Sequence, residues 1–202
     1  MKFLTFTDVH SDFSIIKRLS KVAEADDITC IIICGDFTFM GQNLRKVLEH
    51  FDKMPKPVYL IPGNHEEHTS FNEMVKSYDN ITNCDRKSVR IGEYVLLGYG
   101  GGGFLLENDE YREIARDWYN KYKNEKIILL THQPPYGTPL DNLSIGHVGC
   151  KDIRRSLKRL LPIVALSGHI HESAGVCTEV DGVTILNPGW DGKIVELPSG
   201  KL

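Results

Sequence analysis

The stretch Ile31-Ile32-Ile33-Cys34-Gly35-Asp36 decides the fold. Its apolar residues run without interruption and are mostly β-branched, which is typical of a strand buried on both faces in a parallel sheet. A glycine ends the run, and a carboxylate follows it directly. Because open α/β sheets keep their binding sites at the carboxyl ends of the strands, the pattern predicts that Asp36 belongs to such a site.

Working outward, further apolar runs also end at aspartate, histidine or asparagine. They are Phe3-Leu4-Thr5-Phe6-Thr7 before Asp8-Val9-His10, Val58-Tyr59-Leu60-Ile61 before Gly63-Asn64-His65, Ile127-Ile128-Leu129-Leu130-Thr131 before His132, and Ile163-Val164-Ala165-Leu166-Ser167 before Gly168-His169-Ile170-His171. Taken singly, each polar residue fits a helix cap, a turn or a hydrogen-bonded histidine. Taken together, they predict a metal site shared by the strand ends, with Asp36 as the natural bridge between two ions.

Composition limits the alternatives. The chain has 202 residues, of which 41% are hydrophobic, so we expect residues 1–202 to form a single domain. The formal net charge of −3 provides no positive field for nucleic acid, and no run reaches transmembrane length. The five cysteines form an odd set without Cys-x-x-Cys spacing, so reduced thiols and a cytoplasmic location are expected.

The remaining periodicity predicts helices and hairpins around these strands. Helical spacing covers Ser11 or Asp12 to Glu24, Leu44–Phe51, Ser70–Tyr78, Glu107–Tyr122 and Lys151–Leu161. Two hairpins are expected at Gly92-Glu93 and Asp181-Gly182, and a last edge strand over Lys193–Leu197. The predicted fold is α/β, a four-layer α-β-β-α sandwich with two mixed β-sheets.

Three loop features are less specific. The segment 133–150 is rich in proline and glycine and is long enough for a lid or binding loop. Its His147 is a candidate substrate contact or, alternatively, a surface histidine. The run Gly100-Gly101-Gly102-Gly103 lacks the ending of a phosphate-binding P-loop, so we expect a flexible loop. Aromatic residues in or near these loops could line a pocket or an interface: Tyr99, Phe104, Tyr136 and Trp190.

The ligand types indicate the chemistry. Mixed carboxylate, imidazole and amide donors suit Mn, Fe, Zn or Ni, and they argue against a calcium site or a thiolate zinc site. Two divalent ions side by side can clamp a phosphate and lower the pKa of water to near neutrality. A phosphate ester is therefore the expected substrate class.

The five motifs, in their order along the chain, resemble those of the calcineurin-like metallophosphoesterases. The motifs are Asp8-Val9-His10, Gly35-Asp36, Gly63-Asn64-His65-Glu66, Thr131-His132 and Gly168-His169-Ile170-His171. The resemblance extends from residue 8 to residue 171. The loop motifs of this chain are similar to those of small archaeal and bacterial members of the family. The resemblance implies the calcineurin-like phosphoesterase fold and a phosphodiesterase or phosphatase activity.

Residue by residue, the resemblance implies two divalent ions. Asp8, His10 and His171 would hold the first ion, Asn64, His132 and His169 the second, and Asp36 would bridge them. A hydroxide between the ions would attack the phosphorus, and His65 would contact the phosphate and protonate the leaving oxygen. Asn64 and His147 are further candidate substrate contacts. Some small members carry cysteine in place of His65, so this histidine favours a working enzyme.

One departure and two alternatives accompany this interpretation. Trp190 stands where small members often have serine after Asn187-Pro188-Gly189, and we expect it to change the floor or wall of the pocket. A metal-dependent nuclease is an alternative, although the acidic balance disfavours it. The other alternative is a protein-interaction scaffold that retains the phosphoesterase fold, but its ligand residues would be eroded, whereas here they are all present. The sequence leaves the oligomeric state open.

Overall fold

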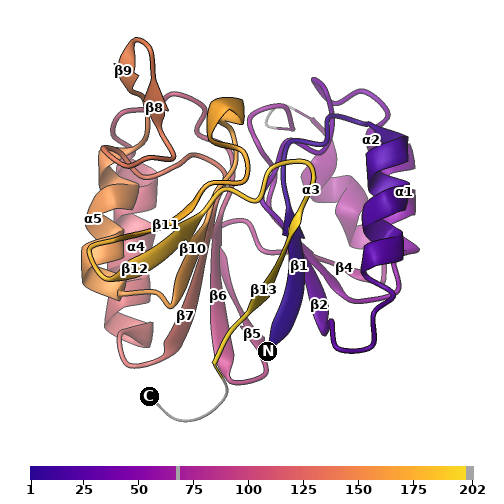
Figure 1. The fold of residues 1–202 in the computed structure, drawn as a ribbon, viewed down its shortest axis with the longest axis horizontal. Coiled ribbons are helices and arrows are strands. Elements are labelled where there is room, and N and C mark those ends of the chain that lie inside the picture. Colours follow the sequence, from indigo (N-terminus) through magenta and orange to yellow (C-terminus); the bar gives the residue numbers. More distant parts are fainter. Residues whose placement is uncertain (67–68, 199–202) are drawn as a thin grey trace.

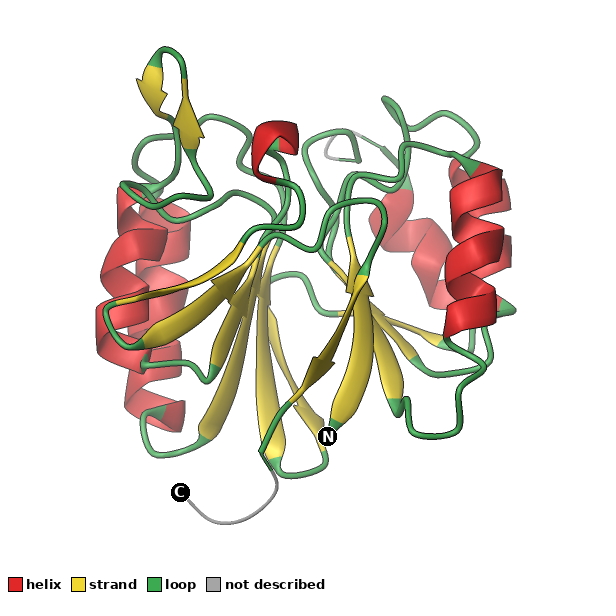
Figure 2. Ribbon diagram, in the orientation of Figure 1, coloured by secondary structure: helices red, strands yellow, loops and turns green. Residues whose placement is uncertain are grey.

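The computed structural model describes residues 1–66 and 69–198. Two sheets lie face to face at its centre, and helices cover the outer face of each sheet (Figure 1, Figure 2). On one side lie α1 (Phe13–Val22), α2 (Leu44–Asp52) and α3 (Phe71–Met74), and on the other side lie α4 (Asp109–Tyr122) and α5 (Lys151–Leu160). This confirms the predicted four-layer α-β-β-α sandwich.

The first sheet has the order β13-β1-β2-β3-β4. Its strands are β1 (Lys2–Phe6), β2 (Cys30–Ile33), β3 (Val58–Leu60), β4 (Ile81–Asn83) and β13 (Lys193–Glu196). Strands β1 to β4 are parallel to their neighbours, while β13 pairs antiparallel with β1 at the edge. The sheet is therefore mixed, and the expected edge strand at the end of the chain is confirmed.

The second sheet has the order β11-β12-β10-β7-β6-β5. Its strands are β5 (Lys87–Ile91), β6 (Tyr94–Tyr99), β7 (Lys126–Thr131), β10 (Val164–Leu166), β11 (Cys177–Val180) and β12 (Val183–Leu186). Both predicted hairpins form, β5–β6 at one edge and β11–β12 at the other. Asp181 and Gly182 take φ values of 54° and 77°, the left-handed pair that a type I′ turn requires.

Three apolar cores separate the four layers. Ile31 and Ile33 of β2 pack with α1 and α2, whereas Ile32 points the other way into the core between the sheets. The third core joins the second sheet to α4 and α5 and contains Trp118 and Leu157. Because successive side chains of a strand point to opposite faces, the uninterrupted apolar run of β2 fills two cores at once.

The structure corrects the sequence prediction in a few places. The helix expected over Ser70–Tyr78 is split into the short α3 and the 3₁₀ turn η1 (Val75–Ser77). Strand β4 was not predicted, and the loop 133–150 carries a small hairpin of β8 (Asn142–Leu143) and β9 (Gly146–His147). A second 3₁₀ turn, η2 (His171–Ser173), follows β10. All of these segments are too short for periodicity to reveal.

The cysteines and the membrane prediction can be compared with the structure directly. All five thiols are free, four of them buried and Cys177 exposed, as expected. Among the helices of residues 1–66 and 69–198, none combines the length and the apolar character needed to cross a membrane. The sequence also favours a place on helices for His50 and His68, as structural or solvent-facing residues; His50 lies on α2, and His68 lies outside the described residues.

Candidate metal centre

Neighbouring strands end at the same level in the sheet, and this brings the predicted loops together. Phe6 pairs with Ile33, and Ile33 pairs with Leu60, so β1, β2 and β3 stop side by side. In the second sheet Leu130 pairs with Leu166, so the loops after β7 and β10 are also adjacent. The carboxyl ends of the parallel strands of both sheets lie toward the top of Figure 1.

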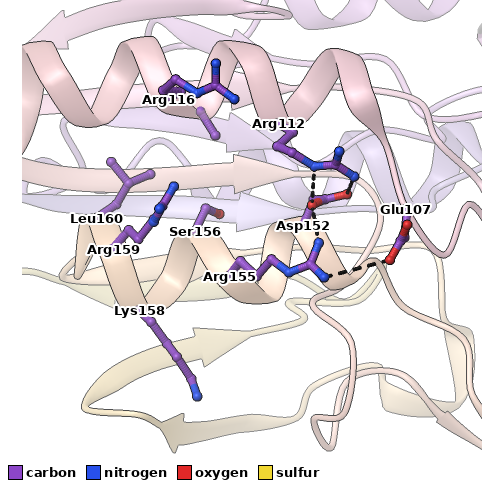
Figure 3. A pocket seen from close by; sticks show the side chains of 10 residues that line it. Glu107, Arg112, Arg116, Asp152, Arg155, Ser156, Lys158, Arg159 and Leu160 are labelled. Atoms are coloured by element: carbon purple, nitrogen blue, oxygen red, sulfur yellow. Dashed lines mark hydrogen bonds and ion pairs between the residues drawn. The ribbon is translucent and has the colours of Figure 1, made fainter.

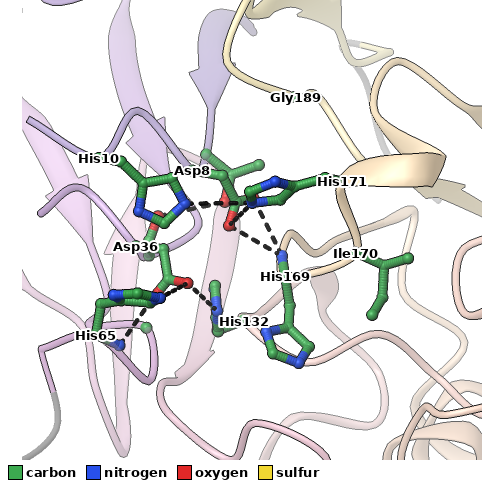
Figure 4. A network of polar contacts seen from close by, with 12 residues as sticks. Asp8, His10, Asp36, His65, His132, His169, Ile170, His171 and Gly189 are labelled. Atoms are coloured by element: carbon green, nitrogen blue, oxygen red, sulfur yellow. Dashed lines mark hydrogen bonds and ion pairs between the residues drawn. The ribbon is translucent and has the colours of Figure 1, made fainter. Parts of the chain in front are cut away.

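Side chains from these loops converge into three overlapping groups of ligand type (Figure 4). The groups are Asp8, His10 and His171; His10, Asp36 and His65; and Asp36, His132 and His169, each with one ligand atom per residue within 4.8 Å of the others. His10 and Asp36 each belong to two of the groups, and Asp36 is the carboxylate that links His10 to His132 and His169. Asn64 joins the last group, since its Oδ1 lies 3.0 Å from His132 Nε2.

The loops hold these residues in unusual backbone conformations. Asp8, His10, Asp36 and His169 have φ values of 55°, 42°, 48° and 69°, in the left-handed region that non-glycine residues rarely adopt. Such conformations cost energy and persist only where the surroundings over-determine them. Four of them in one cluster indicate that the loops are shaped to aim side chains at a common point.

His132 shows why the group containing Asp36 fits a cation. Its Nδ1 donates to the carbonyl oxygen of Cys34 at 2.8 Å, and a carbonyl can only accept, so this nitrogen carries a proton. The other nitrogen, Nε2, then faces Asp36 Oδ2 at 3.2 Å and Asn64 Oδ1 at 3.0 Å. Both facing atoms are acceptors, so this arrangement needs a positive charge among them, either a second ring proton or a metal ion.

The pKa values of the pair reflect this requirement in the metal-free chain. Burial would lower the pKa of His132, but the Asp36 carboxylate outweighs it and raises the pKa to about 9. Burial would likewise raise the pKa of Asp36, but His132 and the amide of His65 hold it at about 2. A metal ion would replace the second proton of His132, because a ligating imidazole must be neutral.

The other candidate histidine ligands also have ring nitrogens that are available to a metal ion. His10 Nδ1 donates to the carbonyl of Thr38 at 3.0 Å, which leaves Nε2 facing His171 Nε2 at 3.2 Å. His171 Nε2 lies 3.7 Å from Asp8 Oδ1. Within the described residues, His169 Nε2 is buried and has no hydrogen-bond partner, and burial lowers the His169 pKa to about 4. These nitrogen and oxygen donors fit divalent ions of the kind predicted.

Glycines make the close approach of the loops feasible. A Cβ atom at Gly63 would lie 2.0 Å from Asp36 Oδ1, and one at Gly168 would lie 2.0 Å from Thr7 Oγ1 and 2.7 Å from Asp8 Oδ2. Gly35, with φ of 97°, leaves room for His132 Nδ1, which would be 2.7 Å from a Cβ there. The glycines of these motifs are therefore packing requirements of the site.

Glu66 is a residue whose role the sequence did not reveal. It is only 2% exposed, and its carboxylate accepts hydrogen bonds from the amides of Thr38 at 2.8 Å and Gly63 at 2.9 Å and from the Thr38 hydroxyl. Burial and the neighbouring Asp36 raise its pKa to about 7. The carboxylate ties the loop after β2 to the loop after β3, and only its place beside His65 in the sequence hinted at this.

His65 lies at the centre but with a different hydrogen-bond arrangement. The amide of Met40 donates to His65 Nδ1 at 3.0 Å, so in the neutral ring the proton is on Nε2. Nε2 is 3.8 Å from Asp36 Oδ2, and the His65 amide donates to Asp36 Oδ1 at 2.9 Å. A protonated Nε2 suits a hydrogen-bond donor better than a metal ligand.

His147 is not brought into the ligand groups. It lies on β9, in the hairpin that projects at the upper left of Figure 1, and its Nδ1 contacts Asp141 Oδ1 at 2.8 Å. Asp141 is fully buried and also accepts from the amides of Gly137, Thr138 and Gly149. This carboxylate, which the sequence did not single out, organises the loop 133–150.

A groove also lies away from the strand ends. It has a volume of about 720 Å³ and runs between α4 and α5 on the outer face (Figure 3). Its main feature is a network in which buried Asp152 binds Arg112 at 2.9 Å and Arg155 at 2.7 Å. Asp152 also accepts from the Asn108 amide, which precedes α4. The network therefore joins the two helices.

Fold and side-chain arrangement together define a candidate metal centre at the strand ends of a four-layer α-β-β-α sandwich. The family model for calcineurin-like phosphoesterases matches residues 1–173. The chain belongs to this family, which confirms the resemblance inferred from the motifs.

Two curated proteins illustrate the relationship. The UPF0046 protein K07C11.7 of Caenorhabditis elegans is 27% identical over 198 residues, covering 87% of this chain and 65% of the relative. A probable glycerophosphodiester phosphodiesterase, GpdQ, of Arcobacter nitrofigilis is 24% identical over 179 residues, covering 81% of this chain and 64% of the relative. The chain therefore spans slightly less than two thirds of the length of these relatives.

Solved structures share the fold. The protein TT1561 of Thermus thermophilus superimposes with a TM-score of 0.76 at 13% identity, covering 94% of this chain and 90% of that one. A dimetal phosphatase from Danio rerio has a TM-score of 0.59 at 13% identity, covering 92% and 86%. An archaeal phosphodiesterase has a TM-score of 0.56 at 19% identity, covering 94% and 84%.

Proposed function

We propose that this chain is a dimetal-dependent phosphoesterase that hydrolyses a phosphodiester or phosphomonoester. The first ion would be held by Asp8, His10 and His171, the second by Asn64, His132 and His169, with Asp36 shared. The observation that carries the proposal is the convergence of histidine and aspartate ligand atoms to within 4.8 Å of one another, with acceptor atoms facing His132 Nε2. Asp36 supports the shared role because its carboxylate lies both in the group with His10 and in the group with His132 and His169.

Asp36 and His65 would have separate roles in the hydrolysis of the ester. Divalent ions, when bound, supply Lewis acidity toward phosphate oxygens and make a water nucleophile available at neutral pH. Asp36 stays ionised because its pKa is about 2, so it offers both oxygens throughout the neutral range. His65 presents Nε2–H toward the centre, because the Met40 amide occupies its other nitrogen. An alkoxide leaving group needs such a proton.

The first test is hydrolysis of bis-p-nitrophenyl phosphate and p-nitrophenyl phosphate by chelator-stripped protein, with and without added manganese. We expect activity to appear on adding metal. The name of the Arcobacter relative favours trying diesters first. A protein that binds manganese but hydrolyses neither ester would contradict the proposal and leave the scaffold interpretation.

The proposed proton donor can be tested separately from metal binding. We expect His65→Ala to keep its manganese content and to lose about 10²–10⁴-fold in turnover on an alkyl ester. It should lose far less on a p-nitrophenyl ester, whose leaving group needs no proton. His50→Ala is the matched control, since His50 Nδ1 contacts the Lys46 carbonyl on α2, outside the ligand groups. Equal losses on both esters would refute the assignment.

Partners and location complete the proposal. A small phosphate ester remains the proposed substrate, and the net charge of −3 gives no reason to expect nucleic acid. Manganese is the proposed test metal because mixed oxygen and nitrogen donors accept it, although iron, zinc and nickel suit the same donors. Free thiols throughout the chain fit a reducing compartment, so the cytoplasm is the proposed location.

A further inference from the structure

Three exposed aromatic rings stand around the candidate metal centre. Phe39, Phe104 and Trp190 are 52%, 65% and 36% exposed, although large aromatic side chains gain most from burial. They come from three separate loops, those after β2, β6 and β12. Scattered exposed apolar residues are ordinary on protein surfaces. Aromatic rings that come from separate loops and lie around one site indicate a surface that binds a ligand.

Each ring contacts a different histidine of the site. Phe104 lies 4.5 Å from the His169 ring, Phe39 lies 5.1 Å from His65, and Trp190 lies 5.8 Å from His171, measured between ring centroids. We call Phe39, Phe104 and Trp190 the aromatic rim. The rim therefore borders the ligand groups directly, within reach of a substituent on a phosphate bound among them.

Backbone hydrogen bonds hold the Phe104 side of the rim in place. The Leu105 amide donates to the Gly102 carbonyl at 3.0 Å, and the buried Gln133 side chain donates to the Leu105 carbonyl at 2.8 Å. The amide of Lys151 donates to the Leu106 carbonyl at 2.9 Å. Phe104 is thus exposed on an anchored loop, which lowers the cost of ordering it on binding.

The other two rings are anchored as well. Before Trp190, the Gly189 amide donates to buried Asn187 Oδ1 at 2.9 Å, and the Thr7 amide donates to the Gly189 carbonyl at 3.2 Å. At Phe39, its carbonyl accepts from the Gln42 amide at 3.0 Å. Trp190 therefore forms a wall of the site.

We propose that the aromatic rim binds the organic group of the substrate and that this group is planar and apolar, as in an aryl phosphate ester. The inference rests on the proposed phosphoesterase function and deepens it. A small polar alcohol would leave all three rings in water, whereas a planar group could stack on them and be partly buried. Tyr99 and Tyr136 take no part, because Tyr99 is buried and Tyr136 contacts His147.

The test is calorimetric titration of manganese-loaded protein with phosphonates, which are not hydrolysed. We expect phenylphosphonate to bind about 10- to 100-fold more tightly than methylphosphonate, the gain from burying a phenyl-sized group. Phe104→Ala should reduce this preference about three- to tenfold, because it should weaken phenylphosphonate binding more than methylphosphonate binding. Leu161→Ala is the control. Leu161 is 64% exposed and lies just before β10, at the end of that strand opposite to the candidate ligands.

The outcomes separate the two levels of the proposal. Equal affinities for phenyl- and methylphosphonate, or an equal loss of both in Phe104→Ala, would overturn the rim while leaving the phosphoesterase proposal intact. Hexylphosphonate binding more tightly than phenylphosphonate would overturn the planar assignment in favour of an aliphatic chain. Failure of every phosphonate to bind, together with no ester hydrolysis, would overturn the proposed function itself.

Discussion

Removing the Glu66 carboxylate is the most informative single perturbation of this chain. It would break the link between the loop that follows β2 and the loop that follows β3, without touching a candidate ligand. Thr38 lies two residues after Asp36, and Gly63 directly precedes Asn64. We therefore expect Glu66→Ala to lower both the free energy of unfolding and the metal affinity.

The magnitude follows from the groups left unpaired. Glu66→Ala leaves the buried amides of Thr38 and Gly63 without an acceptor. At about 1–3 kcal/mol for each unsatisfied buried donor, the loss is about 2–6 kcal/mol, a large part of the about 5–15 kcal/mol that stabilises a typical domain. Glu66→Gln keeps the volume but turns one acceptor into a donor that faces an amide, so about half of this loss is expected.

The assay is urea unfolding of the metal-free protein at pH 8, above the Glu66 pKa of about 7, followed by manganese titration. Glu73→Ala is the control, because within residues 1–66 and 69–198 the Glu73 carboxylate pairs only with Lys76 at the surface, and exposed ion pairs contribute little. A Glu66→Ala protein with the midpoint and metal affinity of the parent would show that water satisfies the two amides and that the carboxylate does not organise the site.

Three further perturbations probe the same region. Gly168→Ala should reduce manganese binding at least tenfold by equilibrium dialysis, since its Cβ would collide with Thr7 Oγ1 at 2.0 Å; unchanged binding would refute the packing requirement. Because the His132 pKa is about 9, manganese affinity measured against a competing chelator should rise up to about tenfold per pH unit below pH 9 and then level off. In the metal-free protein, the same raised pKa stabilises the fold below about pH 6.5 and this contribution is lost as the pH rises through 9, which thermal unfolding at pH 6 and pH 10 would detect. Asp141→Ala should expose the loop 133–150 to proteolysis, because three amides and His147 lose their acceptor; an unchanged digestion pattern would contradict that role.

Much of the fold could be predicted because its signals are long and apolar. The run ending at Asp36 fills two cores, so no polar residue interrupts it, and the other site-bearing strands share this property. Strand β4 was missed because Ile81 is its only apolar residue. The β8–β9 hairpin was missed because its strands have two residues each and lie on the surface.

The candidate site divides in a similar way. Residues immediately after predicted strands could be identified, because strand ends converge whatever the details of the loops. The position of Glu66 opposite two amides could not be identified, since it depends on how two loops fold against each other. The left-handed conformations of Asp8 and Asp36 could not be predicted either, because aspartate adopts such a φ only occasionally and its presence alone does not indicate it. Trp190 was singled out from its place after Asn187-Pro188-Gly189, but its position against His171 depends on the turn before it.

The two groups made up of proposed ligands alone are each drawn from both sheets. Asp8 and His10 follow β1 while His171 follows β10, and Asp36 follows β2 while His132 and His169 follow β7 and β10. Neither sheet alone carries either of these two groups, so a partly folded chain with undocked sheets lacks both proposed sets of ligands. Metal would therefore bind only after the two sheets have docked. It would slow the separation of the sheets during unfolding and would not speed their docking during folding. Removal of the metal by a chelator should therefore first weaken the contact between the two sheets.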